Sequence, residues 1–168
     1  MSGFVRFEEL EALPGPVSRY FRSVLRDGQP VVATTEVRQE GHFLLKDTPD
    51  GWRPFSARQR FSTTSPTFVW DAQVRMIAAL PWPCATVRDA YEDGHGSTRA
   101  SLFSFIPLVN AAGAPAINEA ALQRYLAEAV WFPTALLPSE HVAWTAIDDT
   151  HAIVTITDGA TSASLEIA

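Results

Sequence analysis

The feature that most constrains this chain is an alternation of apolar and polar side chains, repeated in short segments between turns. The clearest segment is 68–77, where the even-numbered side chains are apolar and most odd-numbered ones are polar. A β-strand points successive side chains to opposite faces, so this period predicts half-buried strands. Similar segments occupy much of residues 31–106 and 142–168, separated by turn signals such as Asp-Gly pairs. Short turns predict that neighbouring strands pair antiparallel.

Two helices are predicted in addition, one at 16–26 before the strands and one at 119–131 inserted among them. We therefore expect one domain of residues 1–168, mainly β (α+β), with about eight or nine strands. Because two helices cannot cover both faces of an open sheet, we expect a strongly curved antiparallel sheet or half-barrel. The helices would then close part of its concave side. The uncharged segment 107–115 is expected to be a flexible loop that gates entry to this side.

Charge and composition exclude several classes of protein. The 168 residues carry a net charge of −6, and the basic residues are scattered, which argues against a nucleic-acid-binding surface. The hydrophobic content of 46% predicts a core that needs neither a metal nor a disulfide, and the single cysteine offers no zinc-binding spacing. No segment predicts a signal sequence or a membrane-spanning helix, so we expect a cytoplasmic protein without metal or cofactor.

Glu128 is the ionisable residue with the clearest chemical potential, because the segment 126–137 around it is otherwise apolar or small, apart from Thr134. A partly desolvated carboxylate in such a setting can act as a general acid or base. Arg124 and Trp131 lie about one turn away on the same predicted helix face. The alternative is an ion pair between Arg124 and Glu128 that anchors the helix on the sheet.

Polar and aromatic side chains on the strands are further candidates for a site. One strand face carries Asp71, Gln73 and Arg75, and it faces either solvent or a cavity. In the second case these side chains would join Gln59, Asp89 or Arg99. Large aromatic side chains usually belong to the core, but five are also candidates for ligand contact. These are Trp70, Phe103, Phe105, Tyr125 and Trp131.

Five longer motifs occur in one order along the chain. They are LPxPVxRYF (13–21), DGQP (27–30), WxPFxAxQ (52–59), FVWDA (68–72) and RYLAEAVWFPTALLP (124–138). Together they resemble a bacterial family of uncharacterised proteins over nearly the whole chain. The pattern is also loosely similar to half-barrel carriers of lipids and lipoproteins. That resemblance implies a curved sheet that holds an acyl chain against a helical lid, and it implies no established activity.

The resemblance has a further implication for the end of the chain. Members of that family continue for several more strands, so the last predicted strand, from Thr161, would present an open edge or meet a partner chain. A homodimer through this terminal strand is therefore an expectation.

Two functions of different classes follow from these observations. The leading hypothesis is a non-catalytic binder of a lipophilic small molecule or acyl chain in the concave cavity. The alternative is a small enzyme of the cyclase, isomerase or hydrolase type that uses Glu128 as general acid or base in the same cavity, with Asp71 or Arg124 orienting the substrate. Changing Glu128 to glutamine separates them, because the enzyme loses turnover by orders of magnitude while the binder keeps its ligand.

Overall fold

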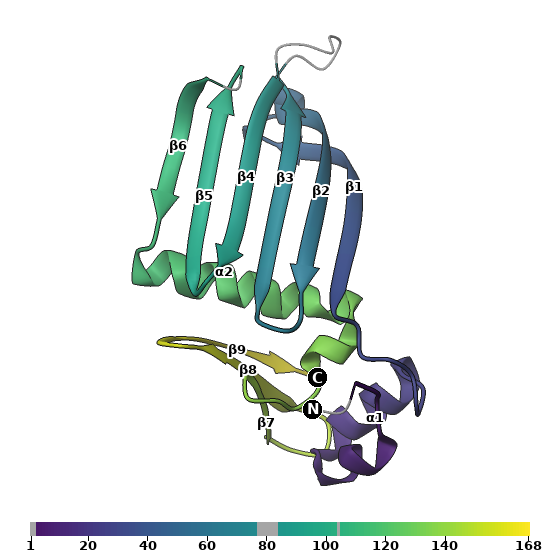
Figure 1. Ribbon diagram of the computed structural model, residues 1–168. Helices are drawn as coiled ribbons and strands as arrows, with labels where there is room; N and C mark the ends of the chain where they lie inside the picture. The colour runs from purple at the N-terminus through teal and green to yellow at the C-terminus, as the bar shows by residue number, and fades with distance from the viewer. Residues whose placement is uncertain (1–2, 77–83, 104) are drawn as a thin grey trace.

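Nine antiparallel strands and two α-helices make up the described part of the chain, residues 3–76, 84–103 and 105–168 of a computed structural model. Six strands form one sheet in the order β1-β2-β3-β4-β5-β6, and three form a second in the order β7-β8-β9 (Figure 1). The large sheet contains β1 (Thr34–Leu44), β2 (Trp52–Ser62), β3 (Thr67–Arg75), β4 (Cys84–Glu92), β5 (His95–Leu102) and β6 (Ile106–Ala112). The small sheet contains β7 (Val142–Ala146), β8 (Ala152–Asp158) and β9 (Thr161–Ile167). The helices are α1 (Gly15–Val24) and α2 (Pro115–Glu128).

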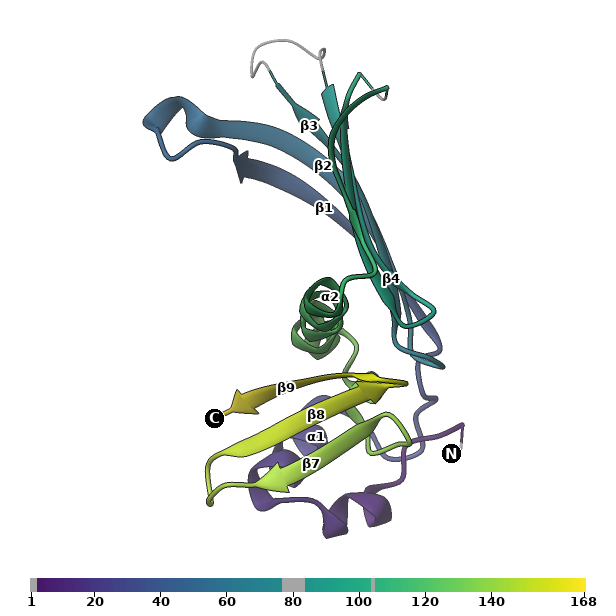
Figure 2. The same ribbon diagram turned by 90° about the vertical axis from the view of Figure 1, so that its left-hand side faces the viewer.

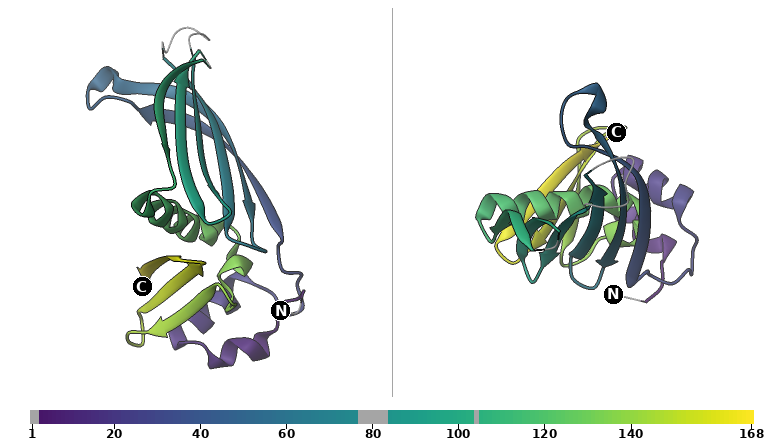
Figure 3. Two further views of the ribbon diagram at one scale, coloured as in Figure 1. Left: turned by 60° about the vertical axis from the view of Figure 1, so that its left-hand side comes forward. Right: turned by 90° about the horizontal axis from the view of Figure 1, so that it is seen from above.

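The six-stranded sheet is curved, and α2 crosses the concave face near one end of it (Figures 2 and 3). The small sheet lies on the other side of α2, with α1 packed beside it. Phe21 of α1 meets Trp144 of β7 edge to face, with 6.0 Å between ring centroids. The expected class is therefore confirmed: a mainly β protein with a curved antiparallel sheet, an N-terminal helix and an inserted helix. The strands form two sheets with α2 between them, and no closed barrel is present in the described residues.

A glycine sets how closely α2 approaches the large sheet. A Cβ added at Gly96 of β5 would lie 2.5 Å from the Ile117 carbonyl oxygen and 2.9 Å from the Ala121 Cβ. Only glycine allows this approach without displacing the helix. The Gly96 N–H also donates to the Asn118 side-chain oxygen at 2.8 Å, which fixes the position of α2 along β5.

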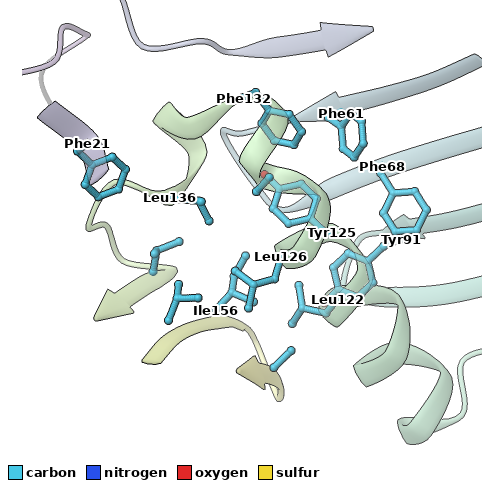
Figure 4. Packing of buried hydrophobic residues seen from close by; sticks show 14 of the residues in the cluster. Phe21, Phe61, Phe68, Tyr91, Leu122, Tyr125, Leu126, Phe132, Leu136 and Ile156 are labelled. Carbon is cyan, nitrogen blue, oxygen red and sulfur yellow. The ribbon is translucent and has the colours of Figure 1, made fainter. Parts of the chain in front are cut away.

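The core lies on both sides of α2. On the side of the large sheet, Tyr125 packs among the rings of Phe61, Phe68 and Phe132 (Figure 4). On the other side, Leu126 lies toward Ile156 of β8. Because sheets cover both sides of it, the buried surface of α2 is wider than the single apolar stripe of a surface helix.

The segment predicted as a gating loop is largely a strand. Residues 106–112 form β6, which pairs antiparallel with β5 and ends where Gly113 adopts a φ of 72°. The expectation of a flexible loop at 107–115 is therefore wrong. Pro107 is compatible with this strand, because proline lacks the N–H that a central strand needs but is tolerated at a sheet edge, where β6 lies. The predicted strand range 31–106 also includes residues 77–83 and 104, which lie outside the described residues.

The tyrosines give a first testable prediction. Burial raises the pKa of all three tyrosines, Tyr20, Tyr91 and Tyr125, above the ordinary value of 10.0. A raised folded-state pKa stabilises the fold below pH 10 and loses that contribution as the pH rises further. We expect the folded protein to show little phenolate absorbance at pH 10, whereas the urea-unfolded chain is about half ionised there. Half-ionisation of any tyrosine in the folded protein at this pH would contradict the assignment.

Candidate functional site

Four polar side chains meet on the concave face where the last turn of α2 crosses β2, β3 and β4. We call Gln59, Asp89, Arg124 and Glu128 the polar cluster. The Arg124 Nε donates to Glu128 Oε1 at 3.1 Å, and its NH1 nitrogen donates to Asp89 Oδ2 at 2.8 Å. The Gln59 Nε2 donates to Glu128 Oε2 at 2.5 Å. Arg124 thus joins two carboxylates, and Glu128 joins the helix to the sheet.

Strand alternation and register explain this convergence. In the large sheet Gln59 pairs with Trp70, and Trp70 pairs with Asp89, so the three side chains form one row across β2, β3 and β4. The spacing of Arg124 and Glu128, one helical turn apart, places both over this row. The Arg124 guanidinium lies over two rings, 5.0 Å from the Phe68 centroid and 5.2 Å from that of Trp70. These contacts hold the guanidinium against the sheet.

Two acceptors in the polar cluster lack donors. Gln59 is fully buried, and its Nε2 must face the Glu128 carboxylate because its oxygen would be repelled there. The Gln59 Oε1 and the Asp89 Oδ1 are buried without a hydrogen-bond partner in the described part of the chain. A buried acceptor without a donor costs about 1–3 kcal/mol. The polar cluster carries two carboxylates and one guanidinium, so a ligand group that donates hydrogen bonds complements it.

A groove and an apolar surface adjoin the polar cluster. The groove, of about 360 Å³, runs between α2 and β4–β5, and Phe68, Asp89, Thr98 and Arg124 contribute to its lining. Two residues further along each strand lies a row that is entirely apolar. We call it the apolar row, and it consists of Ala57, Ala72, Val87, Ala100 and Val109. Figure 2 shows α2 near the end of the large sheet that is closer to the small sheet, and no described helix lies over the opposite end of the concave face.

The structure brings four predicted site residues together. Glu128, Arg124, Gln59 and Trp70 lie side by side on the concave face. The predicted ion pair of Arg124 and Glu128 is present, and its side chains are 30% and 17% exposed. Trp70 also donates its Nε1–H to the Gln39 side chain at 2.7 Å.

Three predicted polar residues lie on the opposite, convex face. Asp71 and Arg75 follow Trp70 and Val74 on β3, so alternation turns them away from α2. Asp71 accepts hydrogen bonds from Arg88 at 2.8 and 3.0 Å, and Arg99 lies opposite Arg88 in the neighbouring strand. The hypothesis that Asp71, Arg75 or Arg99 shares a concave cavity with Glu128 is therefore wrong.

The remaining aromatic candidates lie apart from the polar cluster. Tyr125 is buried in the core and donates its hydroxyl to the Ser62 carbonyl at 2.9 Å. Trp131 is half-exposed beside Phe61. Phe103 and Phe105 stack on each other at the β5–β6 turn, with 6.0 Å between centroids. These four predicted ligand contacts are not brought to the site.

Asp89 and Gln39 also contact site residues, Asp89 through Arg124 and Gln39 through Trp70, but they were not among the leading predicted residues. The alternation of Ala85, Val87 and Tyr91 placed Asp89 on the apolar face of its strand, and that was the available signal. Within the described residues, no group of three His, Cys, Asp or Glu side chains is arranged to hold a metal ion. None of the helices described is both long enough and apolar enough to cross a membrane.

The comparisons with known proteins identify a family. No curated protein and no solved structure matches the chain. The model of a family of unknown function (DUF6544) matches residues 3–168, and the chain therefore belongs to that family.

Proposed function

We propose that this protein binds a lipophilic small molecule or acyl chain on the concave face of its large sheet, without converting it. The observation that carries this proposal is the apolar row beside the polar cluster, in which two carboxylates share one guanidinium. Together they match the two halves of an amphiphile, an apolar body and a polar end.

The apolar row suits an elongated ligand. It crosses five strands, so it extends about 19 Å at the usual spacing between strands. Its side chains are all alanine or valine, so an alkyl chain lying along it would meet only small apolar groups. Each methylene buried there contributes about 0.8 kcal/mol, so a long chain gains more than a compact ring. Two exposed apolar side chains share the concave face on the edge strands, Phe43 of β1 and Ile106 of β6.

The polar cluster favours a particular kind of head group. In the polar cluster the two carboxylates outnumber the single guanidinium. A hydroxyl, an amide N–H or an ammonium group donates hydrogen bonds to carboxylates. A free carboxylate head is disfavoured because it would add a third negative charge.

The pairing of Glu128 supports binding rather than acid–base catalysis. Both of its oxygens already accept hydrogen bonds, one from Arg124 and one from Gln59. A general acid or base needs an oxygen within reach of the proton that it transfers. Glu128 therefore fits the role of a fixed partner that orients Arg124 and Gln59.

Native mass spectrometry of freshly purified protein tests the proposal. We expect a reproducible additional mass that is lost on denaturation and that belongs to a molecule with an alkyl chain and a donor head group. A protein that carries no such mass and takes up neither a long-chain alcohol nor a long-chain amide would contradict the proposal.

A matched pair of variants tests on which face of the large sheet the ligand binds. Ala57→Asp puts a charge into the apolar row, whereas Ser56→Asp puts the same charge on the convex face of the same strand. We expect Ala57→Asp to lower ligand occupancy at least tenfold, because a buried carboxylate opposes an alkyl chain, and Ser56→Asp to leave occupancy within twofold. Occupancy is measured by native mass spectrometry with a long-chain alcohol. Equal effects of the two variants would show that the ligand does not lie on the concave face.

A further inference from the structure

The convex face of the large sheet gathers arginines that are far apart in the sequence. Register places Arg38 opposite Arg58, Arg58 opposite Asp71, Asp71 opposite Arg88, and Arg88 opposite Arg99. These side chains form one row across β1 to β5. The charged groups of this face over β1 to β5 are Arg38, Arg58, Arg60, Arg75, Arg88 and Arg99 with Glu36, Glu40, Asp71 and Glu92. A chain of net charge −6 therefore has a face with more arginines than carboxylates.

The positive charges along this row are not all paired with carboxylates. Glu36 lies 3.4 Å from both Arg38 and Arg58, so it partly neutralises this first pair of arginines. In the second pair, Arg88 is bonded to Asp71, while Arg99 has no carboxylate partner among the described residues. Like charges directly opposite each other on neighbouring strands are destabilising. A bound anion would remove this repulsion at Arg88 and Arg99.

A groove surrounds this second pair. It has a volume of about 480 Å³, and we call it the convex groove. Its lining includes Thr86, Arg88, Arg99, Ser101, Phe105 and Asn110. The Thr86 and Ser101 hydroxyls lie 2.8 Å apart, and Asn110 stands opposite Arg99 on the edge strand. Hydroxyl, amide and guanidinium groups are all donors that anionic oxygens accept.

One wall of the convex groove is aromatic. Phe105 is 75% exposed and stacks on Phe103, so it offers a flat apolar surface beside the two arginines. We propose that the convex groove binds a small organic anion, with a carboxylate or phosphate group between Arg88 and Arg99 and a ring against Phe105. This site lies on the opposite face of the sheet from the polar cluster and does not depend on the function proposed above.

Titrations followed by amide chemical shifts test this proposal with phenyl phosphate, benzoate and inorganic phosphate as probes. We expect phenyl phosphate or benzoate to bind saturably below about 10 mM, with shifts centred on β4–β6. Inorganic phosphate should bind at least fivefold more weakly because it has no ring. Equal affinity for inorganic phosphate would overturn the aromatic part, and no saturable binding of any probe would overturn the whole proposal.

Two exposed arginines provide the matched comparison. Arg99→Gln removes a charge from the convex groove, and Arg60→Gln removes one from the same face outside it. We expect Arg99→Gln to weaken binding at least tenfold, Arg99→Lys to weaken it less, and Arg60→Gln to change it less than twofold. Equal losses in Arg99→Gln and Arg60→Gln would show diffuse attraction to a basic face instead of a site.

Discussion

Replacing Arg124 by methionine is expected to destabilise the protein by about 2–3 kcal/mol. The replacement leaves two largely buried carboxylates without the guanidinium that neutralises them. Asp89 and Glu128 side chains are only 23% and 17% exposed, and both are bonded to Arg124. Methionine keeps much of the apolar stem that packs against Phe68 and Trp70, so the loss reports on charge more than on packing. The free energy of unfolding in urea measures it.

A neighbouring ion pair provides the control for this prediction. Arg88 and Asp71 are also 2.8 Å apart, but each side chain is 45% exposed on the convex face. Exposed ion pairs contribute little, so Arg88→Met should cost less than about 1 kcal/mol. Neutralising both carboxylates in the Arg124→Met protein, with Asp89→Asn and Glu128→Gln, should restore part of the lost stability. Equal costs for Arg124→Met and Arg88→Met would refute the view that the polar cluster is an interdependent buried unit.

The sequence was most informative where a local period decides the structure. Alternation put Gln59 and Trp70 on the apolar faces of their strands, and the spacing of Arg124 and Glu128 predicted their pairing. Both inferences need only neighbouring residues of one element. Alternation cannot say which face of a sheet turns inward, which is why Asp71 was open to two interpretations.

Register between strands could not be predicted, and it determines both proposed sites. Asp89 lies in the same row as Gln59 because both residues pair with Trp70, which lies between them on β3. The arginines seemed scattered for the same reason, since Arg38 and Arg99 are far apart along the chain yet lie in one row. Turn lengths and packing against α2 set this register, and the alternation within a single strand contains no information about either.

The position of α2 gives the second large prediction, because both the core and the polar cluster depend on it. Gly96→Ala should destabilise the protein by about 2–3 kcal/mol, since the new methyl group would overlap helix atoms that cannot rotate away. These are the Ile117 carbonyl oxygen and the Ala121 Cβ, at 2.5 and 2.9 Å. Urea unfolding again measures the loss.

The matched variant is Gly41→Ala, on the same face of the same sheet. There the nearest atom is the Phe55 Cε1 at 3.2 Å, on a ring that can turn aside, so the cost should stay below about 1 kcal/mol. If α2 holds Arg124 and Glu128 over Gln59 and Asp89, Gly96→Ala must also lower ligand occupancy under conditions where the variant remains folded. Unchanged occupancy in a folded Gly96→Ala protein would mean that the ligand does not depend on the polar cluster. Equal stability of the two variants would mean instead that the helix has room to move. The two readouts therefore separate the role of Gly96 in packing from its role in positioning the site.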